Sequence, residues 1–221
     1  MFRFHPNTSV LISGPPGVGK FEYLIGHARE WIAAGERLVF VTLDLSPREV
    51  RDRAAGLGLD IPSLEGGSLV FVDCYSASAG DTSEAATPRR VFSVSSFSNL
   101  EGIGMAIQKA AQELRPPVRV VFYTISTLFL HNSTQAIAKF FQIITSRVKT
   151  SMGFIAYAVH EGVHEPTTMN LLRSLTDGVV ELRFNEAMGR EHRVHHMRGT
   201  HVDPHWMPLE LEAQTVLLGG A

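Results

Sequence analysis

Short apolar runs alternate with segments of helical periodicity along most of the chain. An apolar run of this length between turn residues is typical of a strand that is buried on both faces. The predicted strands cover residues 9–13, 37–44, 68–73, 118–125 and 153–160. The predicted helices cover residues 20–34, 47–56, 99–114, 133–151 and 166–176. This alternation predicts an α/β fold with a mostly parallel central sheet that is flanked by helices.

Local signals mark several helix ends. Ser46, Pro47 and Glu49 have the spacing of a capping box, in which Ser46 caps a helix that begins at Pro47. Gly35 follows the first predicted helix, at the position where a left-handed residue commonly ends one. The pair at 116–117, Pro-Pro, stops the helix that precedes the fourth strand.

Two stretches depart from the alternating pattern. Residues 74–97 are rich in Ser, Ala and Thr, and a loop of this length is usually functional or mobile, so a defined lid and plain disorder are both open. After residue 178, short apolar runs at 179–184, 193–198 and 207–211 predict a hairpin-rich C-terminal end, followed by a tail at 212–221. Because no repeat and no linker is visible, we expect a single domain over residues 1–221.

Composition and charge exclude several classes of protein. The 221 residues carry a net charge of −2 and no long basic run, which argues against a nucleic-acid or anionic membrane surface. Cys74 is the single cysteine, so no internal disulfide is possible, as is usual in a reducing compartment. No apolar run is long enough for a membrane span or a secretory leader, and we expect a cytoplasmic protein.

A glycine-rich turn joins the first predicted strand to the first predicted helix. It reads Gly14-Pro15-Pro16-Gly17-Val18-Gly19-Lys20 and is followed by Phe21. This is the spacing of a phosphate-binding loop, Gly-x-x-x-x-Gly-Lys-Ser/Thr, with its last position replaced. Glycines let backbone N–H groups surround an anion, while the helix start and the lysine add positive charge. The turn therefore predicts a nucleotide phosphate site; the alternative is a glycine turn that binds nothing.

Further segments complete an ordered set of motifs. They are 41–50 (Val-Thr-Leu-Asp-Leu-Ser-Pro-Arg-Glu-Val), 119–122 (Arg-Val-Val-Phe), 160–164 (His-Glu-Gly-Val-His), 175–179 (Leu-Thr-Asp-Gly-Val) and 197–200 (Met-Arg-Gly-Thr). Together with the glycine-rich loop, this set resembles the KaiC-like branch of the RecA-type P-loop ATPases over nearly the whole chain. The resemblance implies a RecA-like core and ATP or ADP in the loop. It also implies a homo-oligomeric ring, such as a hexamer, and a role in regulation or signal transduction with an unidentified protein partner.

The chain departs from the family pattern where the family holds Mg²⁺. Phe21 replaces the loop hydroxyl, and Tyr123 stands where the family has an Asp at the end of a strand. The family also has an acidic pair before Ser-Pro, which here reads Asp44 and Leu45. The resemblance thus leaves Asp44 as the catalytic carboxylate and leaves Mg²⁺ without two of its ligands, so whether the chain is an enzyme stays open. Asp73, which also follows an apolar run, is the rival for the missing Asp.

Three further polar residues are site candidates by the same resemblance. His160 and Glu161 end a predicted strand at the place where RecA-like proteins have a polar residue that senses the terminal phosphate. Arg198 stands at the end of His-Met-Arg, where the family has a Lys-x-Arg strand that reaches a neighbour's nucleotide across the ring interface. The alternative for all three is a solvent-exposed position at the end of a strand.

Histidines gather near the C-terminal end. Five of the ten histidines lie between His192 and His205, and strand alternation predicts that His192 and His196 share one face. Neutral imidazoles bind Zn²⁺, but no cysteine or carboxylate completes a recognisable ligand spacing. We therefore expect a solvent-exposed hairpin and no metal site.

Three hypotheses of function follow. The favoured one is a nucleotide-binding regulatory module with little or no hydrolysis, since the anion cradle is present and the metal ligands are not. The second is an active ATPase in which Asp44 and Asp73 act in rearranged roles. The third is an interaction protein, a ring-forming shell that binds no nucleotide, in which Phe21 and Tyr123 fill a retired site.

Overall fold

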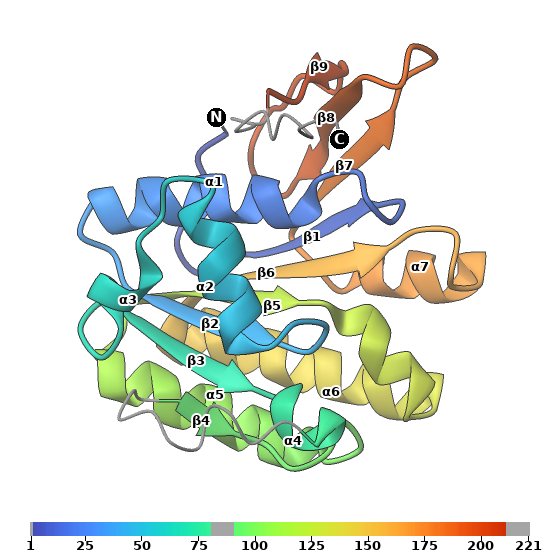
Figure 1. The fold of residues 1–221 in the computed structure, drawn as a ribbon. Helices are drawn as coiled ribbons and strands as arrows, with labels where there is room; N and C mark the ends of the chain where they lie inside the picture. The colour runs from blue at the N-terminus through green and yellow to red at the C-terminus, as the bar shows by residue number, and fades with distance from the viewer. Residues whose placement is uncertain (1, 81–90, 211–221) are drawn as a thin grey trace, which may run out of the picture.

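A nine-stranded, mostly parallel sheet forms the centre of the computed structural model, which describes residues 2–80 and 91–210 (Figure 1). The strand order is β4-β3-β2-β5-β6-β1-β7-β8-β9. The strands are β1 (Ser9–Gly14), β2 (Leu38–Thr42), β3 (Leu69–Asp73), β4 (Val91–Ser93), β5 (Val118–Tyr123), β6 (Gly153–His160), β7 (Gly178–Phe184), β8 (Arg190–Met197) and β9 (Met207–Pro208). All pairs from β4 to β7 are parallel, and β8 and β9 add an antiparallel end.

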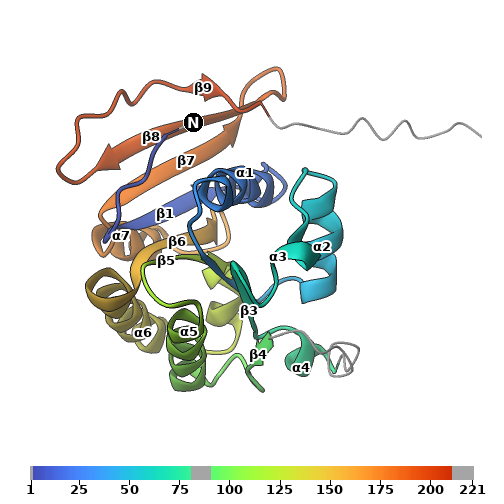
Figure 2. The ribbon, with the colours of Figure 1, turned by 90° about the vertical axis from the view of Figure 1, so that its left-hand side faces the viewer.

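Helices cover both faces of the sheet and enclose two apolar cores (Figure 2). One face carries α1 (Lys20–Ala33), α2 (Pro47–Ala55) and α3 (Ile61–Leu64), and the other carries α5 (Leu100–Leu114), α6 (Thr134–Arg147) and α7 (Pro166–Ser174). Successive strand residues point to opposite cores, so Val120 and Phe122 pack under α5 and α6, whereas Val121 and Tyr123 pack under α1. Tyr123 therefore lies on the same face as the helix that follows the glycine-rich turn.

The parallel register gathers the candidate residues at one edge of the sheet. Gly14, the last residue of β1, pairs with His160, the last residue of β6. Thr42 pairs with both Tyr123 and Asp73 at the ends of the neighbouring strands. Because parallel strands share one carboxyl edge, the loops that follow β1, β2, β5 and β6 meet there.

The capping residues end or begin helices as the sequence predicts, but the predicted ends of one strand and one helix differ from those observed. The Ser46 side chain accepts from the backbone N–H of Glu49, and the Glu49 carboxylate accepts from the N–H of Ser46, which completes the capping box. Gly35 has φ 77° and follows the end of α1. The strand predicted to reach residue 125 ends at Tyr123 in a 3₁₀ helix (Ile125–Leu130), and α6 ends at Arg147 in a π-helical turn (Val148–Met152).

The loop expected at 74–97 contains regular structure. A short helix, α4 (Ser76–Ala79), follows β3, and β4 adds an edge strand to the sheet by pairing with β3. Such a short edge strand takes its structure from its partner, which is why periodicity does not reveal it. Residues 81–90 of this loop, Leu211 and the tail at 212–221 lie outside the described residues.

A bulge in β8 corrects the expected placement of the histidines. Val180 pairs with Val194 and Val179 pairs with His196, so His195 is an extra residue in β8. The extra residue reverses the alternation of faces. His192 consequently packs against the ring of Tyr23 on α1, at a centroid distance of 5.6 Å, whereas His196 lies on the opposite face. The prediction that His192 and His196 share a face was wrong.

Candidate functional site

The glycine-rich turn forms an open anion cradle between β1 and α1. Gly17 and Gly19 adopt φ of 78° and 104°, which only glycine reaches without strain, and Gly19 is the N-cap of α1. No side chain caps the first turn of this helix, so its N–H groups face the loop. Gly14 is required for packing instead, because a Cβ there would lie 2.6 Å from the carbonyl oxygen of Leu182 on β7. The strand, turn and helix expected from the sequence are all present.

Lys20 is folded back into this cradle. Its Nζ donates to the carbonyl oxygens of Gly14 and Pro15, both at 2.7 Å, and the residue is only 3% exposed. Burial lowers the pKa of Lys20 to about 8, and the negative charges of Glu161, Asp44 and Glu22 oppose this shift. The ammonium is thus held at the loop by two carbonyl groups. A phosphate bound in the loop would take their place as its hydrogen-bond partner.

Aromatic side chains occupy the two positions where the family pattern has metal ligands. Phe21, on the first turn of α1, is buried and packs edge-on against Tyr123 at a centroid distance of 5.5 Å. Phe40 on β2 also packs edge-on against Phe21, at a centroid distance of 6.4 Å. Burial raises the pKa of Tyr123 to about 12, so its hydroxyl is neutral at physiological pH. Phe21 has no donor atom and Tyr123 has a neutral phenol, so this pair does not fit Mg²⁺, which prefers charged or carbonyl oxygen.

The Asp44 carboxylate is held by a network of hydroxyl groups and one imidazole. Thr124 Oγ1 donates to Oδ2 at 2.8 Å, Thr127 Oγ1 donates to Oδ1, and His160 Nε2 lies 3.5 Å from Oδ2. Burial raises the pKa of Asp44, but the bonds from His160, Thr127 and Thr124 outweigh burial and hold the pKa below its ordinary value. Asp44 is therefore a charged group, and each of its oxygens accepts a hydrogen bond from a threonine hydroxyl.

Thr124 and Thr127 were not site candidates in the sequence. Each contacts Asp44 only because the loop after β5 lies beside the loop after β2 at the carboxyl edge. Hydroxyl residues in a loop are common, and no spacing connects residues that lie 80 or more positions apart. The order of the strands, which decides the contact, is a tertiary property.

The side chains of Glu161 and Asp73 bond to groups outside the cradle. Glu161 forms an ion pair with Arg173 Nη2 at 2.6 Å, while its backbone N–H donates to the carbonyl oxygen of Gly14. Asp73 Oδ1 accepts from the backbone N–H groups of Tyr75 and Ser76 and so caps the turn after β3. Since β2, β5 and β6 lie between β3 and the loop strand β1, Asp73 is a poor rival for the missing metal ligand.

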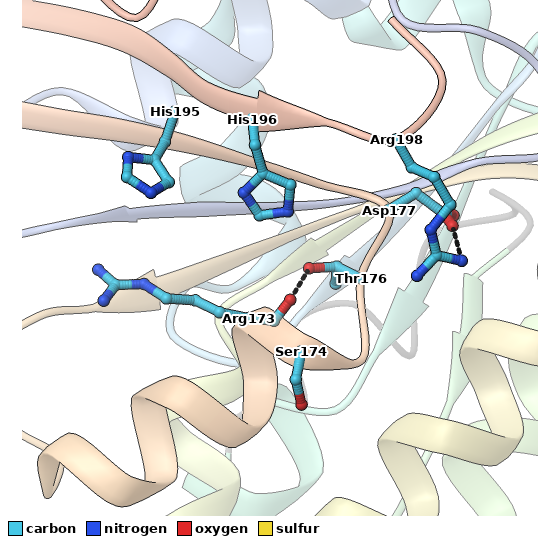
Figure 3. A pocket seen from close by; sticks show the side chains of 7 residues that line it. All are labelled: Arg173, Ser174, Thr176, Asp177, His195, His196 and Arg198. Atoms are coloured by element: carbon cyan, nitrogen blue, oxygen red, sulfur yellow. Dashed lines mark hydrogen bonds and ion pairs between the residues drawn. The ribbon is translucent and has the colours of Figure 1, made fainter.

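Arg198 lies at the opposite edge of the sheet from the loop. It follows the end of β8, beside the start of β7, and its guanidinium contacts Asp177 Oδ1 at 3.0 Å (Figure 3). The surrounding pocket has a volume of about 310 Å³ and is lined by Arg173, Ser174, Thr176, Asp177, His195, His196 and Arg198. Arg198 therefore cannot reach the loop of its own chain, and a contact with a nucleotide would have to cross to a neighbouring molecule.

The described part of the chain has neither a cluster of metal ligands nor a membrane-spanning helix. Within residues 2–80 and 91–210, no three His, Cys, Asp or Glu side chains gather closely enough to hold a metal ion. In the same ranges, no helix has the length and apolar character needed to cross a membrane.

Comparison with known proteins places the chain in a family. A family model described as "Family of unknown function (DUF7504)" matches residues 7–182. The chain belongs to this family. A UPF0273 protein of Aeropyrum pernix is 28% identical over 225 residues, covering 95% of this chain and 84% of the relative. A UPF0273 protein of Thermotoga maritima is 24% identical over 226 residues, covering 95% and 86%.

A solved structure shows the fold of this DUF7504 member. The KaiC-like protein PH0186 of Pyrococcus horikoshii superposes with a TM-score of 0.69 at 20% identity, covering 92% of this chain and 85% of the other. The fold is the KaiC-like, RecA-type α/β fold that the ordered motifs predict. At this identity the comparison concerns the fold, and the function has to be argued from the site.

Proposed function

We propose that this protein is a nucleotide-binding regulatory or signal-transduction module that binds ATP or ADP at the loop Gly14–Lys20 with little or no hydrolysis. The observation that carries the proposal is the combination of an open cradle, with Lys20 buried in it, and an aromatic pair where metal ligands are expected. The cradle and the lysine favour phosphate, because helix N–H groups and an ammonium both attract an anion. The fold and the ordered motifs agree with this assignment.

The same geometry argues that binding is weak and that Mg²⁺ does not strengthen it. Loss of one interaction with a charged group costs about 1.5–3 kcal/mol, which corresponds to roughly ten- to a hundredfold in affinity. Phe21 removes one such contact with the metal, and Tyr123 removes a second. Lys20 and the loop N–H groups still bind the phosphates, so the metal-free nucleotide is the species that the site suits.

Hydrolysis is disfavoured for three separate reasons. Phosphoryl transfer depends on positioning and on charge, much of which Mg²⁺ supplies, and the Phe21–Tyr123 pair holds no metal. Leu45 stands where the KaiC-like pattern has the second of two carboxylates before Ser-Pro. Asp44, the remaining carboxylate, is engaged by Thr124 and Thr127 at both of its oxygens. These two bonds fix the orientation of Asp44, so a water can use only the acceptor positions that they leave.

Assembly is a second part of the proposal. Arg198 lies far from the loop of its own chain, and a head-to-tail contact would bring it to the loop of a neighbour. We therefore propose a homo-oligomer, such as a ring, in which the edge with Arg198 faces the carboxyl edge of the next molecule. An interaction protein that binds no nucleotide is the alternative and is an outcome of the tests below.

The binding proposal predicts the behaviour of the Lys20→Ala variant. Wild-type protein gives heat with millimolar ATP or ADP in calorimetry, and Mg²⁺ does not raise the affinity above that in EDTA. Lys20→Ala loses about tenfold or more in affinity, because the buried ammonium is absent. The control is Lys139→Ala, which removes an exposed charge on α6 and leaves binding unchanged. Absence of heat for the wild type would favour the interaction protein.

The hydrolysis proposal predicts phosphate release near background for the wild type and for Lys20→Ala alike. Removal of one well-placed catalytic group costs about 10²–10³ in rate, so even one of the missing groups makes turnover slow. The double repair Phe21→Thr with Tyr123→Asp is assayed beside them for a gain of Mg²⁺ dependence, after thermal denaturation shows that it is folded. Robust Mg²⁺-dependent release by the wild type, abolished in Lys20→Ala, would contradict the proposal and show that other residues of this chain hold the metal.

The assembly proposal predicts a molecular mass above that of the monomer in light scattering. The mass rises with protein concentration or with added ATP, and Arg198→Ala shifts the equilibrium toward monomer. The matched control is Arg190→Ala at the other end of β8, where an exposed charge is removed without effect on the mass. A constant monomer mass under all these conditions would refute the oligomer.

A further inference from the structure

A guanidinium lies beside the aromatic pair that replaces the metal ligands. Arg53, in the last turn of α2, places its Cζ 4.2 Å from the ring centroid of Phe21. The ring of Phe21 in turn packs edge-on against Tyr123. The positive charge of Arg53 also acts on Tyr123, where it opposes the rise in pKa that burial causes. One fixed cation is thus close to both positions from which the metal ligands are missing.

We propose that Arg53 supplies the positive charge that Mg²⁺ supplies in related sites, and that the ligand of the loop is a metal-free nucleoside di- or triphosphate. This inference rests on the proposed nucleotide binding and adds to it a named cation and a ligand form. It also makes a stronger statement about the metal: Mg²⁺ weakens binding, because it competes with Arg53 for the phosphates.

The stacking on Phe21 positions Arg53 without using its hydrogen bonds. A guanidinium over an aromatic face is attracted by the ring, while its N–H groups point outward in the plane of the fork. The one ion pair found for Arg53 among the described residues is a long contact of 3.4 Å with Glu22, and the side chain is 43% exposed. Arg53 therefore keeps N–H donors accessible to an anion. A planar guanidinium also suits phosphate, since it can donate two parallel bonds.

The charges around the loop show why a second cation is needed. Three carboxylates, Glu161, Asp44 and Glu22, act on Lys20. Arg173 already pairs with Glu161, but a nucleotide adds several further negative charges that the single ammonium of Lys20 does not balance. Arg53 contacts Glu22 directly and so reduces the local negative charge before a ligand arrives. Phe21 thus offers no metal ligand and also contacts the guanidinium that would act in place of the metal.

The alternative is a purely structural role, in which Arg53 stacks on Phe21, remains solvated and contacts no ligand. In that case its removal changes stability slightly and nucleotide affinity not at all. Arg48 provides a matched control for this alternative, because it lies on the same helix, is 75% exposed and forms a long contact of 3.9 Å with Asp52. Removal of either arginine changes the net charge of the protein equally, so long-range electrostatic effects cancel in the comparison.

The test is calorimetric titration of the full chain with ATP and ADP, in EDTA and in excess Mg²⁺, for the wild type, Arg53→Gln, Arg53→Lys and Arg48→Gln. We expect the wild type to bind in EDTA, and Mg²⁺ to weaken it by about two- to fivefold. Arg53→Gln loses about tenfold in EDTA, as for one charge-assisted contact, and no longer responds to Mg²⁺ in this way. Arg53→Lys loses less than Arg53→Gln because the charge remains, and Arg48→Gln stays within about twofold of the wild type. Thermal denaturation confirms that each variant is folded.

The possible failures are distinguishable. If the wild type binds but Arg53→Gln binds equally well, Arg53 is a stacking residue only, and the proposed nucleotide binding survives. Strengthening of wild-type binding by Mg²⁺ overturns the metal-free ligand. If folded Arg53→Lys is as weak as Arg53→Gln, the charge of Arg53 is not what the ligand uses. Absence of wild-type binding in every buffer overturns the proposed function and this inference together.

Discussion

The buried ammonium of Lys20 is the interaction on which the site depends. Its two hydrogen bonds to the carbonyl oxygens of Gly14 and Pro15 close the turn between β1 and α1. Because Lys20 is only 3% exposed, these carbonyl groups take the place of water as partners of its charge. Burial lowers the pKa of this lysine to about 8, which means that the charged ammonium is destabilised in the ligand-free protein. An anion in the cradle would relieve that cost, which gives the site a physical reason to bind phosphate.

Packing and chemistry are coupled in the first turn of α1. Phe21 belongs to the apolar core between α1, β2 and β5, and it is also the residue that removes a metal ligand. The phenyl ring supports Arg53 on its outer side. The phenyl ring of Phe21 provides core contacts and the aromatic face over which the guanidinium of Arg53 lies. Replacement of Phe21 by Thr would therefore lower stability as well as offer a hydroxyl to a metal.

The sequence predicted the parts of this structure that arise from local signals. The strand before Gly14, the turn with Gly17 and Gly19 and the helix from Lys20 each follow from residues that are adjacent in the chain. The capping box at Ser46 is of the same kind. These signals act through the backbone within a few residues, so no knowledge of the tertiary fold is needed.

Contacts between distant segments could not be predicted in the same way. The hydrogen bond from Thr127 to Asp44 and the stacking of Arg53 on Phe21 depend on which loops and helices lie side by side. The edge strand β4 takes its structure from β3, and the bulge at His195 changes which histidines share a face. In each case a partner outside the local segment decides the outcome.

The central claim, that Lys20 receives a nucleotide phosphate without a metal, can be tested by the protons that binding takes up. Titration calorimetry with ADP in EDTA at pH 8.5, in two buffers of different ionisation enthalpy, measures this uptake. With a pKa of about 8, Lys20 is mostly neutral at that pH in the free protein, and a bound phosphate raises its pKa. The account predicts uptake of between about half and three-quarters of a proton per site, absent in Lys20→Met. Binding with equal heats in the two buffers would contradict it.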